Sequence, residues 1–254
     1  MKRSLRLFIF YASLVALWQF LTGLKIWPPY LFPSPLSVLS ALRLGFADHT
    51  VPIALATTMK RVALGYGLSV VVGVALGFVI ATSRLLEDTV GSLVVGLQSL
   101  PSICWLPLAV LWFGLSEKAI IFVTVAGSLL SVTINTVAGV QHVPRIYLMA
   151  GRNLGARGFR LFVHVLFPAS LPYVVTGLKQ GWAFAWRSLI SGEMIFVTLG
   201  LGQLLMMGRD LNDMSQVVAV MVMIMAIGYL IDRAVFHNLE SRVRQKWGLE
   251  GSPR

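Results

Sequence analysis

The segment 145–172, RIYLMAGRNLGARGFRLFVHVLFPASLP, lies between two long apolar runs and contains four arginines, one histidine and no acid. Pro144 is placed to open a short helix, because proline suits the first helical position. Gly155 is placed to close it, because glycine accepts the left-handed turn after a helix end. A second short segment, 159–165, runs to Pro168. The pattern predicts two short basic helices, bent at Gly155, that face water between membrane spans.

The same segment carries more apolar residues than a solvated loop needs. If the segment were only a cytoplasmic loop that its positive charge keeps on the inner side of the membrane, its other positions could be polar. An apolar face on a water-side helix instead indicates that another protein docks there. The apolar residues of this face are Ile146, Leu148, Met149, Leu154, Leu161 and Phe162.

The spacing resembles the cytoplasmic coupling motif of ABC importer permeases: Glu-Ala-Ala, three residues, Gly, nine residues, then Ile-x-Leu-Pro. The acid of the motif is absent here, since Met149 stands in its place, and Gly151 replaces the second alanine. Whether this chain has a counterpart of the ion pair between the family's glutamate and the ATPase is therefore an open question. The expected ATPase-coupling residues are Met149, Ala150, Gly151, Arg152, Gly155, Val165 and Pro168, with Phe167 also matching the motif.

A wider similarity, to the nitrate/sulfonate/taurine branch of those permeases, covers nearly the whole chain. It includes PPYLFPSPLSV (28–38), LPSICWLPLAVLWFGLSEKAI (100–120), LPYVVTGLKQGWAFAW (171–186), GEM (192–194) and GLGQLL (200–205). The resemblance implies an all-α, type I importer permease in the bacterial inner membrane, non-catalytic and without a cofactor. It implies ABC ATPase subunits, an external solute-binding protein and a second copy of the chain as partners. The implied substrate is a sulfonate, taurine or nitrate, with a pyrimidine-type vitamin precursor as the alternative.

Composition independently indicates a polytopic membrane protein. The chain has 254 residues, of which 57% are hydrophobic and 12% charged, whereas charged residues make up about a quarter of a soluble domain. The formal charge of +11 does not indicate nucleic-acid binding, because the basic residues cluster beside apolar spans. The single Cys104 excludes an internal disulfide, and the four scattered histidines show no metal-ligand spacing.

Six spans are expected in one transmembrane domain, 1–254, with a first span at 1–24, a core at about 58–236 and a coupling loop at 143–171. The first span could be a signal peptide, but no small-residue cleavage site follows its apolar body, so a retained span is favoured. The proline-rich stretch 25–58 predicts an external connector with a short helix at 37–46. The other expected spans are 62–83, 89–116, 119–141, 172–199 and 214–231, followed by a polar tail.

The second span carries small residues every fourth position. This spacing puts them on one helix face, where another helix can approach closely. Ordinary helix packing is a better explanation of this ridge than a gate. The residues are Gly65, Ser69, Gly73, Gly77 and Ala81.

The third and fifth spans contain the residues expected to line the pathway. Two prolines in the third span predict a kink, and the resemblance favours a kinked pore helix over a plain kink. In the fifth span, Lys179 is expected to snorkel to the membrane interface. For the other two charged residues of that span, a structural role and pathway lining both stay open. The pathway candidates are Pro101, Pro107, Trp186, Arg187 and Glu193.

The distribution of basic residues predicts that both termini are cytoplasmic. With six spans and an inner N-terminus, the inner segments hold 13 Lys and Arg and the outer segments hold six. Positive charge favours the inner side of a membrane. The expected outer residues include Lys60 and Arg61, placed just before the second span.

Chemistry for catalysis is missing from the sequence. Residues 91–97 have the glycines of a phosphate-binding loop but leucine where lysine is required. No Ser/His/Asp grouping or separated pair of carboxylates indicates an intramembrane enzyme. An ion-driven secondary transporter would need membrane-buried acids, and Glu193 is the one clear candidate. A transporter of this kind that uses ATP must therefore borrow an ATPase subunit.

Overall fold

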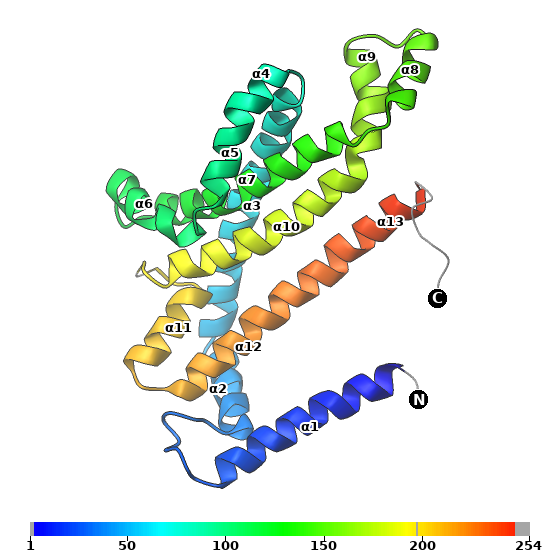
Figure 1. Ribbon diagram of the computed structural model, residues 1–254. Coiled ribbons are helices and arrows are strands. Elements are labelled where there is room, and N and C mark those ends of the chain that lie inside the picture. Colours follow the sequence, from blue (N-terminus) through cyan, green and yellow to red (C-terminus); the bar gives the residue numbers. More distant parts are fainter. Residues whose placement is uncertain (1–2, 197, 247–254) are drawn as a thin grey trace. The chain divides into compact units, whose positions relative to one another are not determined.

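The computed structural model describes residues 3–196 and 198–246, which form helices joined by short turns and no strand (Figure 1). Within these residues, five helices are long and apolar enough to cross a membrane, and a bent pair of shorter helices gives a sixth crossing if the pair is counted as one span. This confirms the prediction of an all-α, multi-pass chain. The chain divides into two compact units: Met1–Thr58 with Glu193–Ala226, and Met59–Gly192 with Ile227–Arg254.

The first unit begins with a helix that packs on little else. Helix α1 (Arg3–Gly23) provides the first span, and none of its residues from Leu5 to Gly23 is buried, which suits a lipid-facing helix. The Trp18 indole Nε1–H donates to the Pro33 carbonyl at 3.0 Å and ties α1 to the connector. The short connector helix is confirmed as α2 (Pro35–Ala47), where Ser34 caps the N-terminus by accepting the Ser37 N–H.

Helix α3 (Thr50–Ile80) begins 12 residues before the expected span and runs for 31 residues without a break. Lys60 and Arg61, expected in an outer segment, lie inside this helix. Arg61 is only 3% exposed, and its guanidinium pairs at 2.9 Å with Glu117, the first residue of α7 (Glu117–Gln141). The expectation failed because a paired arginine is tolerated inside a helix, so its charge does not mark the helix end.

The small-residue ridge packs α3 closely against α7 in the second unit. A Cβ added at Gly73 would lie 3.0 Å from the Leu129 carbonyl oxygen, and one at Gly77 would lie 2.5 Å from Thr136 Cβ. Between these helices the Ser128 hydroxyl donates to Ser69 Oγ at 2.7 Å. These contacts confirm that the ridge serves close helix packing.

We expect Gly73→Leu to destabilise the protein by about 1–3 kcal/mol, because the side chain would be forced against the backbone of α7. The measurement is thermal unfolding of the detergent-purified chain. Gly67→Leu is the matched control, since a Cβ there meets nothing within 4 Å. Equal melting temperatures for the two variants would show that α3 and α7 do not depend on this close approach.

The third span is a broken helix rather than a kinked one. Helices α4 (Arg84–Leu86) and α5 (Ser92–Gln98), joined by a π-helical turn, form the first arm, Arg84–Gln98. The second arm, Ser102–Phe113, contains a 3₁₀ turn and α6 (Leu106–Phe113), and the two arms meet at 101°. Pro101 separates them, since proline lacks an N–H and keeps the preceding residue out of the α conformation. Pro107 adds no second kink because it occupies the first turn of α6, where a missing N–H costs nothing.

The expected second short helix of the loop is the start of the fifth span. Helix α9 (Phe159–Leu161), the π-helical turn Phe162–Leu166 and α10 (Phe167–Glu193) form one apolar helix of 35 residues. The π turn comes just before Pro168, and such wide turns are common where the backbone ladder is interrupted. The helix ends at Glu193, six residues earlier than expected, so this acid lies at a helix terminus and not inside a span.

The last helix is longer than expected. Helix α12 (Met214–Ile231) continues through a π-helical turn into α13 (Asn238–Lys246), whereas a polar tail was expected after Ile231. In the second unit, Lys179 Nζ lies 3.5 Å from Glu240 Oε2 and 3.8 Å from Asp232 Oδ2. Lys179 therefore pairs with acids of this helix instead of only reaching for water. Tail residues 247–254 lie outside the described part of the chain.

Candidate functional site

The predicted turn at Gly155 is confirmed. Helix α8 (Arg145–Asn153) ends in a Schellman turn: Ala156 N–H donates to the Gly151 carbonyl at 2.9 Å, and Gly155 N–H donates to Arg152 at 3.0 Å. Gly155 has φ +84°, a conformation that glycine adopts without strain. The turn reverses the chain so that α8 lies beside the start of the long helix (Figure 1).

Gly151 is buried where α8 meets that helix. A Cβ at this position would lie 2.8 Å from Leu161 Cδ1 and 2.8 Å from Val165 Cγ2. The spacing from Gly151 to Val165 in the sequence thus corresponds to a packing contact inside the segment. Pro168 is half-buried further along the same helix.

The outer surface of the segment is apolar and basic, and we call it the docking surface. Leu154 is 89% exposed, Phe159 79%, Ile146 64% and Met149 56%. Ala150 is also exposed, as are all four arginines of the segment. Leu148, Leu161 and Phe162 are only half-exposed, and Phe162 packs edge-on against Phe78 at 4.9 Å between ring centroids. The predicted apolar face is therefore narrower than the sequence indicated and includes Phe159.

A second feature lies at the break in the third span. A cavity of about 290 Å³ is lined there by residues from the break, α7 and α10, including Pro101 and Arg187. We call it the break pocket. Arg187 is exposed, its Nε–H donates to the Ala183 carbonyl at 2.9 Å, and its guanidinium carbon lies 4.8 Å from the Phe184 ring centroid. These contacts orient the guanidinium beside the pocket.

Trp186 and Pro107, also candidates for the pathway, do not line the break pocket. Trp186 is 7% exposed and stacks on Trp182 with ring centroids 5.7 Å apart. A Cβ at Gly228 would lie 3.0 Å from Trp186 Nε1, so the indole fills the contact between α10 and the last helix. Trp186 is thus placed for helix packing.

Glu193, in the other unit, is fully buried in a hydrogen-bond network. Thr58 Oγ1 lies 3.0 and 2.9 Å from its two carboxylate oxygens, and Gly202 N–H donates to Oε2 at 3.1 Å. The Thr58 hydroxyl also accepts Leu201 N–H at 2.9 Å. Helix α11 (Leu201–Asp210) therefore begins on this network, which satisfies N–H groups that a helix start leaves open. Sequence analysis did not identify Thr58 as a partner of Glu193, because no sequence pattern connects two residues that lie 135 positions apart.

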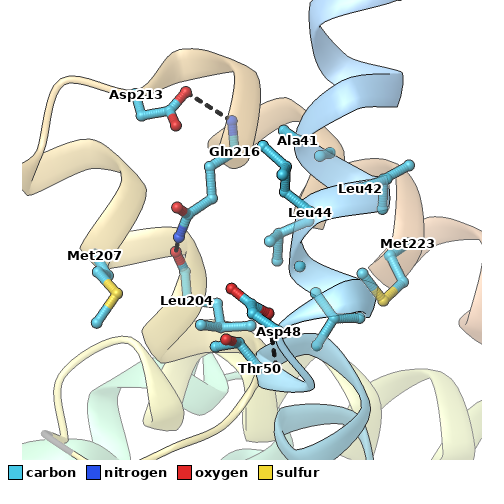
Figure 2. A pocket seen from close by; sticks show the side chains of 14 residues that line it. Ala41, Leu42, Leu44, Asp48, Thr50, Leu204, Met207, Asp213, Gln216 and Met223 are labelled. Carbon is cyan, nitrogen blue, oxygen red and sulfur yellow. Dashed lines mark hydrogen bonds between the residues drawn. The ribbon is translucent and has the colours of Figure 1, made fainter.

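The first unit contains a cavity of about 230 Å³ between α2, the start of α3, α11 and α12 (Figure 2). Its polar side chains already serve the local fold. Asp48 accepts Thr50 N–H at 3.0 Å, and this bond holds the pKa of the Asp48 carboxyl below its usual value. Asp213 accepts Gln216 N–H at 3.0 Å, and Gln216 Nε2–H donates to the Leu204 carbonyl at 2.9 Å. These groups already stabilise helix ends and turns, so they do not indicate a ligand-binding site in this cavity.

Together the long apolar helices and the broken span of the described residues define a multi-pass membrane protein. The family described as "Binding-protein-dependent transport system inner membrane component" matches residues 70–245, and this chain belongs to that family.

Similar proteins include several named transport permeases. A putative ABC transporter permease of Methanocaldococcus jannaschii is 32% identical over 234 residues, covering 88% of this chain and 85% of that protein. The nitrate import permease NrtB of Synechocystis is 30% identical, covering 75% and 70%. The putative aliphatic sulfonates transport permease SsuC of Escherichia coli is 30% identical, covering 92% and 89%.

Solved structures agree on the fold. One chain of the MetNI methionine ABC transporter, crystallised in an inward-facing conformation, superposes on this chain with a TM-score of 0.65 and 18% sequence identity. The match covers 76% of this chain and 96% of that chain. The helical architecture is thus that of an ABC importer permease.

Proposed function

We propose that this chain forms the membrane pathway of an ATP-driven importer for small anions. One observation from the site carries the choice of an anion: the break pocket has Arg187 beside it and no carboxylate in its lining. An unneutralised guanidinium attracts oxyanions, for which its planar fork is suited. The printed names of the relatives, which include nitrate and aliphatic sulfonates, support the same class.

The docking surface is the proposed contact for the ATPase. Its exposed apolar residues, Leu154 and Phe159 foremost, are surrounded by arginines and would be costly to leave in water. Since no acid stands at the motif position, we expect apolar contact to carry more of the association here than an ion pair at Met149. ATP hydrolysis would take place in that partner.

The family supports an external solute-binding protein as a further partner, and we propose a second copy of the chain as another. An external solute-binding protein would deliver the anion, and a second copy of the chain would complete a homodimer in the bacterial inner membrane. The whole chain, 1–254, would act as one permease domain, with its core at about 58–236 and the coupling loop at 143–171. Both termini would be cytoplasmic, as the distribution of basic residues favours.

The test is reconstitution of the full chain with its ATPase and binding protein in proteoliposomes. We expect uptake of labelled nitrate or an alkanesulfonate that requires ATP and stops when the ATPase carries an inactivating substitution. Uptake driven by an ion gradient without ATP would instead support a secondary transporter. Uptake of a pyrimidine but of no anion would support the vitamin-precursor alternative.

A further inference from the structure

Helix α10 exposes a polar face along the part of the chain that crosses the membrane. Beyond Pro172, its exposed residues recur at alternating intervals of three and four, which places them on one side of the helix. None of them is an aliphatic residue larger than alanine. We call this side the polar face, and its residues are Tyr173, Thr176, Gln180, Ala183 and Arg187.

Helix α3, in the same unit from Met59 onward, shows the opposite pattern. Its exposed residues from Leu64 to Val79 are aliphatic or glycine, which suits contact with lipid. Its Ser69 hydroxyl is buried and donates to the Gly65 carbonyl at 2.8 Å. An amide or a guanidinium without a partner costs several kcal/mol in hydrocarbon, so lipid is not a suitable neighbour for the polar face of α10. This face must instead meet water or another protein surface.

Asn135 on α7 determines how the Gln180 amide is turned. Asn135 Nδ2 donates to the Ser131 carbonyl at 2.9 Å and to Gln180 Oε1 at 3.0 Å. A backbone carbonyl can only accept, so it fixes the amide nitrogen of Asn135 on this side, and Gln180 must turn its oxygen toward that nitrogen. The other end of the exposed Gln180 amide, Nε2, makes no hydrogen bond within residues 3–196 and 198–246 and keeps both N–H groups free.

The polar face begins at the break pocket. Arg187 lines that pocket, and Gln180 lies seven residues nearer to the docking surface, about 10 Å along the axis at 1.5 Å per residue. Both side chains are hydrogen-bond donors, and the face carries no carboxylate. Hydrogen bonds from a charged group are stronger than those from a neutral amide. An anion that leaves Arg187 would therefore find a second, weaker donor on the same side of the helix.

We propose that the polar face is one wall of a water-filled pathway, in which Gln180 donates to the anion in transit and Asn135 is the residue that positions it. This inference rests on the proposed function and adds a contact that lies beyond the break pocket. Two polar faces packed directly on each other in a two-fold dimer would bring donors against donors with no carboxylate between them, which disfavours a dry contact with a second copy.

Cysteine labelling of the full chain tests the wall. The protein is purified with any subunits that it retains and placed in nanodiscs, where both membrane sides are accessible. Its single cysteine is first removed by Cys104→Ser. The probe is the hydrophilic anion 2-sulfonatoethyl methanethiosulfonate. Ala183→Cys should react at least about tenfold faster than Val71→Cys, because the reactive thiolate forms in water and not in lipid.

Val71 is the matched control because it is 69% exposed on the apolar side of α3. Gly73 and Gly181, each two residues from one of the compared positions, both approach Val132 of α7. The two cysteines would therefore lie at similar depth, and a difference in rate would report the surroundings rather than the distance from the membrane surface.

The same reagent serves as the probe anion for Gln180. Its rate at Ala183→Cys is divided by the rate of the cationic 2-(trimethylammonium)ethyl reagent. Gln180→Leu should lower this ratio about two- to tenfold, the value of one hydrogen bond, and should fold because the side chain is exposed. Asn135→Leu should also lower the ratio but have no further effect in the Gln180→Leu background, because it acts only through Gln180.

Equal labelling of Ala183→Cys and Val71→Cys would overturn the proposal. Slow labelling together with rapid disulfide formation between two Ala183→Cys chains would overturn it in favour of a second copy on this face. A ratio that Gln180→Leu leaves unchanged would remove Gln180 as a donor. These measurements need no uptake, ATP or binding protein. An importer that takes up anions in proteoliposomes but is not labelled at Ala183→Cys would keep the proposed function and lose this wall.

Discussion

Replacement of Glu193 by leucine should lower the stability of the protein and abolish transport. The carboxylate is fully buried and receives hydrogen bonds from Thr58 and Gly202. Leucine is of similar size but accepts nothing, so both donors would be left buried without an acceptor. Each of the two orphaned donors costs about 1–3 kcal/mol, which gives a loss of about 2–6 kcal/mol. Thermal unfolding in detergent and ATP-driven uptake are the measurements.

Two further variants make the Glu193 test specific. Thr58→Val keeps the shape of the side chain but removes both the donor to Glu193 and the acceptor of the Leu201 N–H. It should therefore lower the melting temperature by itself, and its effect should not add fully to that of Glu193→Leu, because both variants disrupt one network. Asp210→Asn is the control, since Asp210 is an exposed acid on the neighbouring helix α11. If Glu193→Leu melts at the same temperature as Asp210→Asn, the network does not hold the start of α11.

Charged substitutions on the docking surface should release the ATPase. Leu154→Asp combined with Phe159→Asp would put two carboxylates at the most exposed apolar positions of the segment. An apolar interface does not accept unpaired charges, so co-purification of the ATPase should fall at least about tenfold. The permease itself should still reach the membrane, because neither side chain is buried in the chain.

Leu85→Asp is the matched control for docking, because Leu85 is 70% exposed on α4, outside the segment. Retention of the ATPase by the Leu154/Phe159 double variant, or its loss from Leu85→Asp alone, would place the contact elsewhere. Gly151→Glu is a poorer test. Its side chain would collide with Leu161 and Val165, so a loss of binding could reflect damage to the segment itself.

Local signals in the sequence predicted the parts of the fold that depend on local chemistry. Gly155 closes its helix because its own backbone conformation requires glycine. The ridge that includes Gly73 packs because small residues recur on one helix face. Pro101 interrupts its span for the same kind of reason, although the angle of 101° depends on neighbouring helices that a single segment does not reveal.

Features that depend on distant partners were not predictable. Arg61 resembles a boundary charge until its contact with Glu117 is known. From sequence alone, Lys179 resembles a snorkelling residue. Its pairing with Asp232 and Glu240 depends on the last helix, more than 50 residues further along the chain, and is visible only in the folded structure. Of the pathway candidates, the charge of Arg187 was recognisable, but its place beside the break at Pro101 depends on tertiary structure.

The continuous helix from Phe159 to Glu193 has a mechanical consequence. Its 35 residues include a π-helical turn at Phe162–Leu166 and Pro172 inside α10. Both features weaken the backbone hydrogen-bond ladder, so they are the places where this helix bends most easily. A force applied to the docking surface at Phe159 would therefore be taken up first by bending near these residues, close to the surface itself.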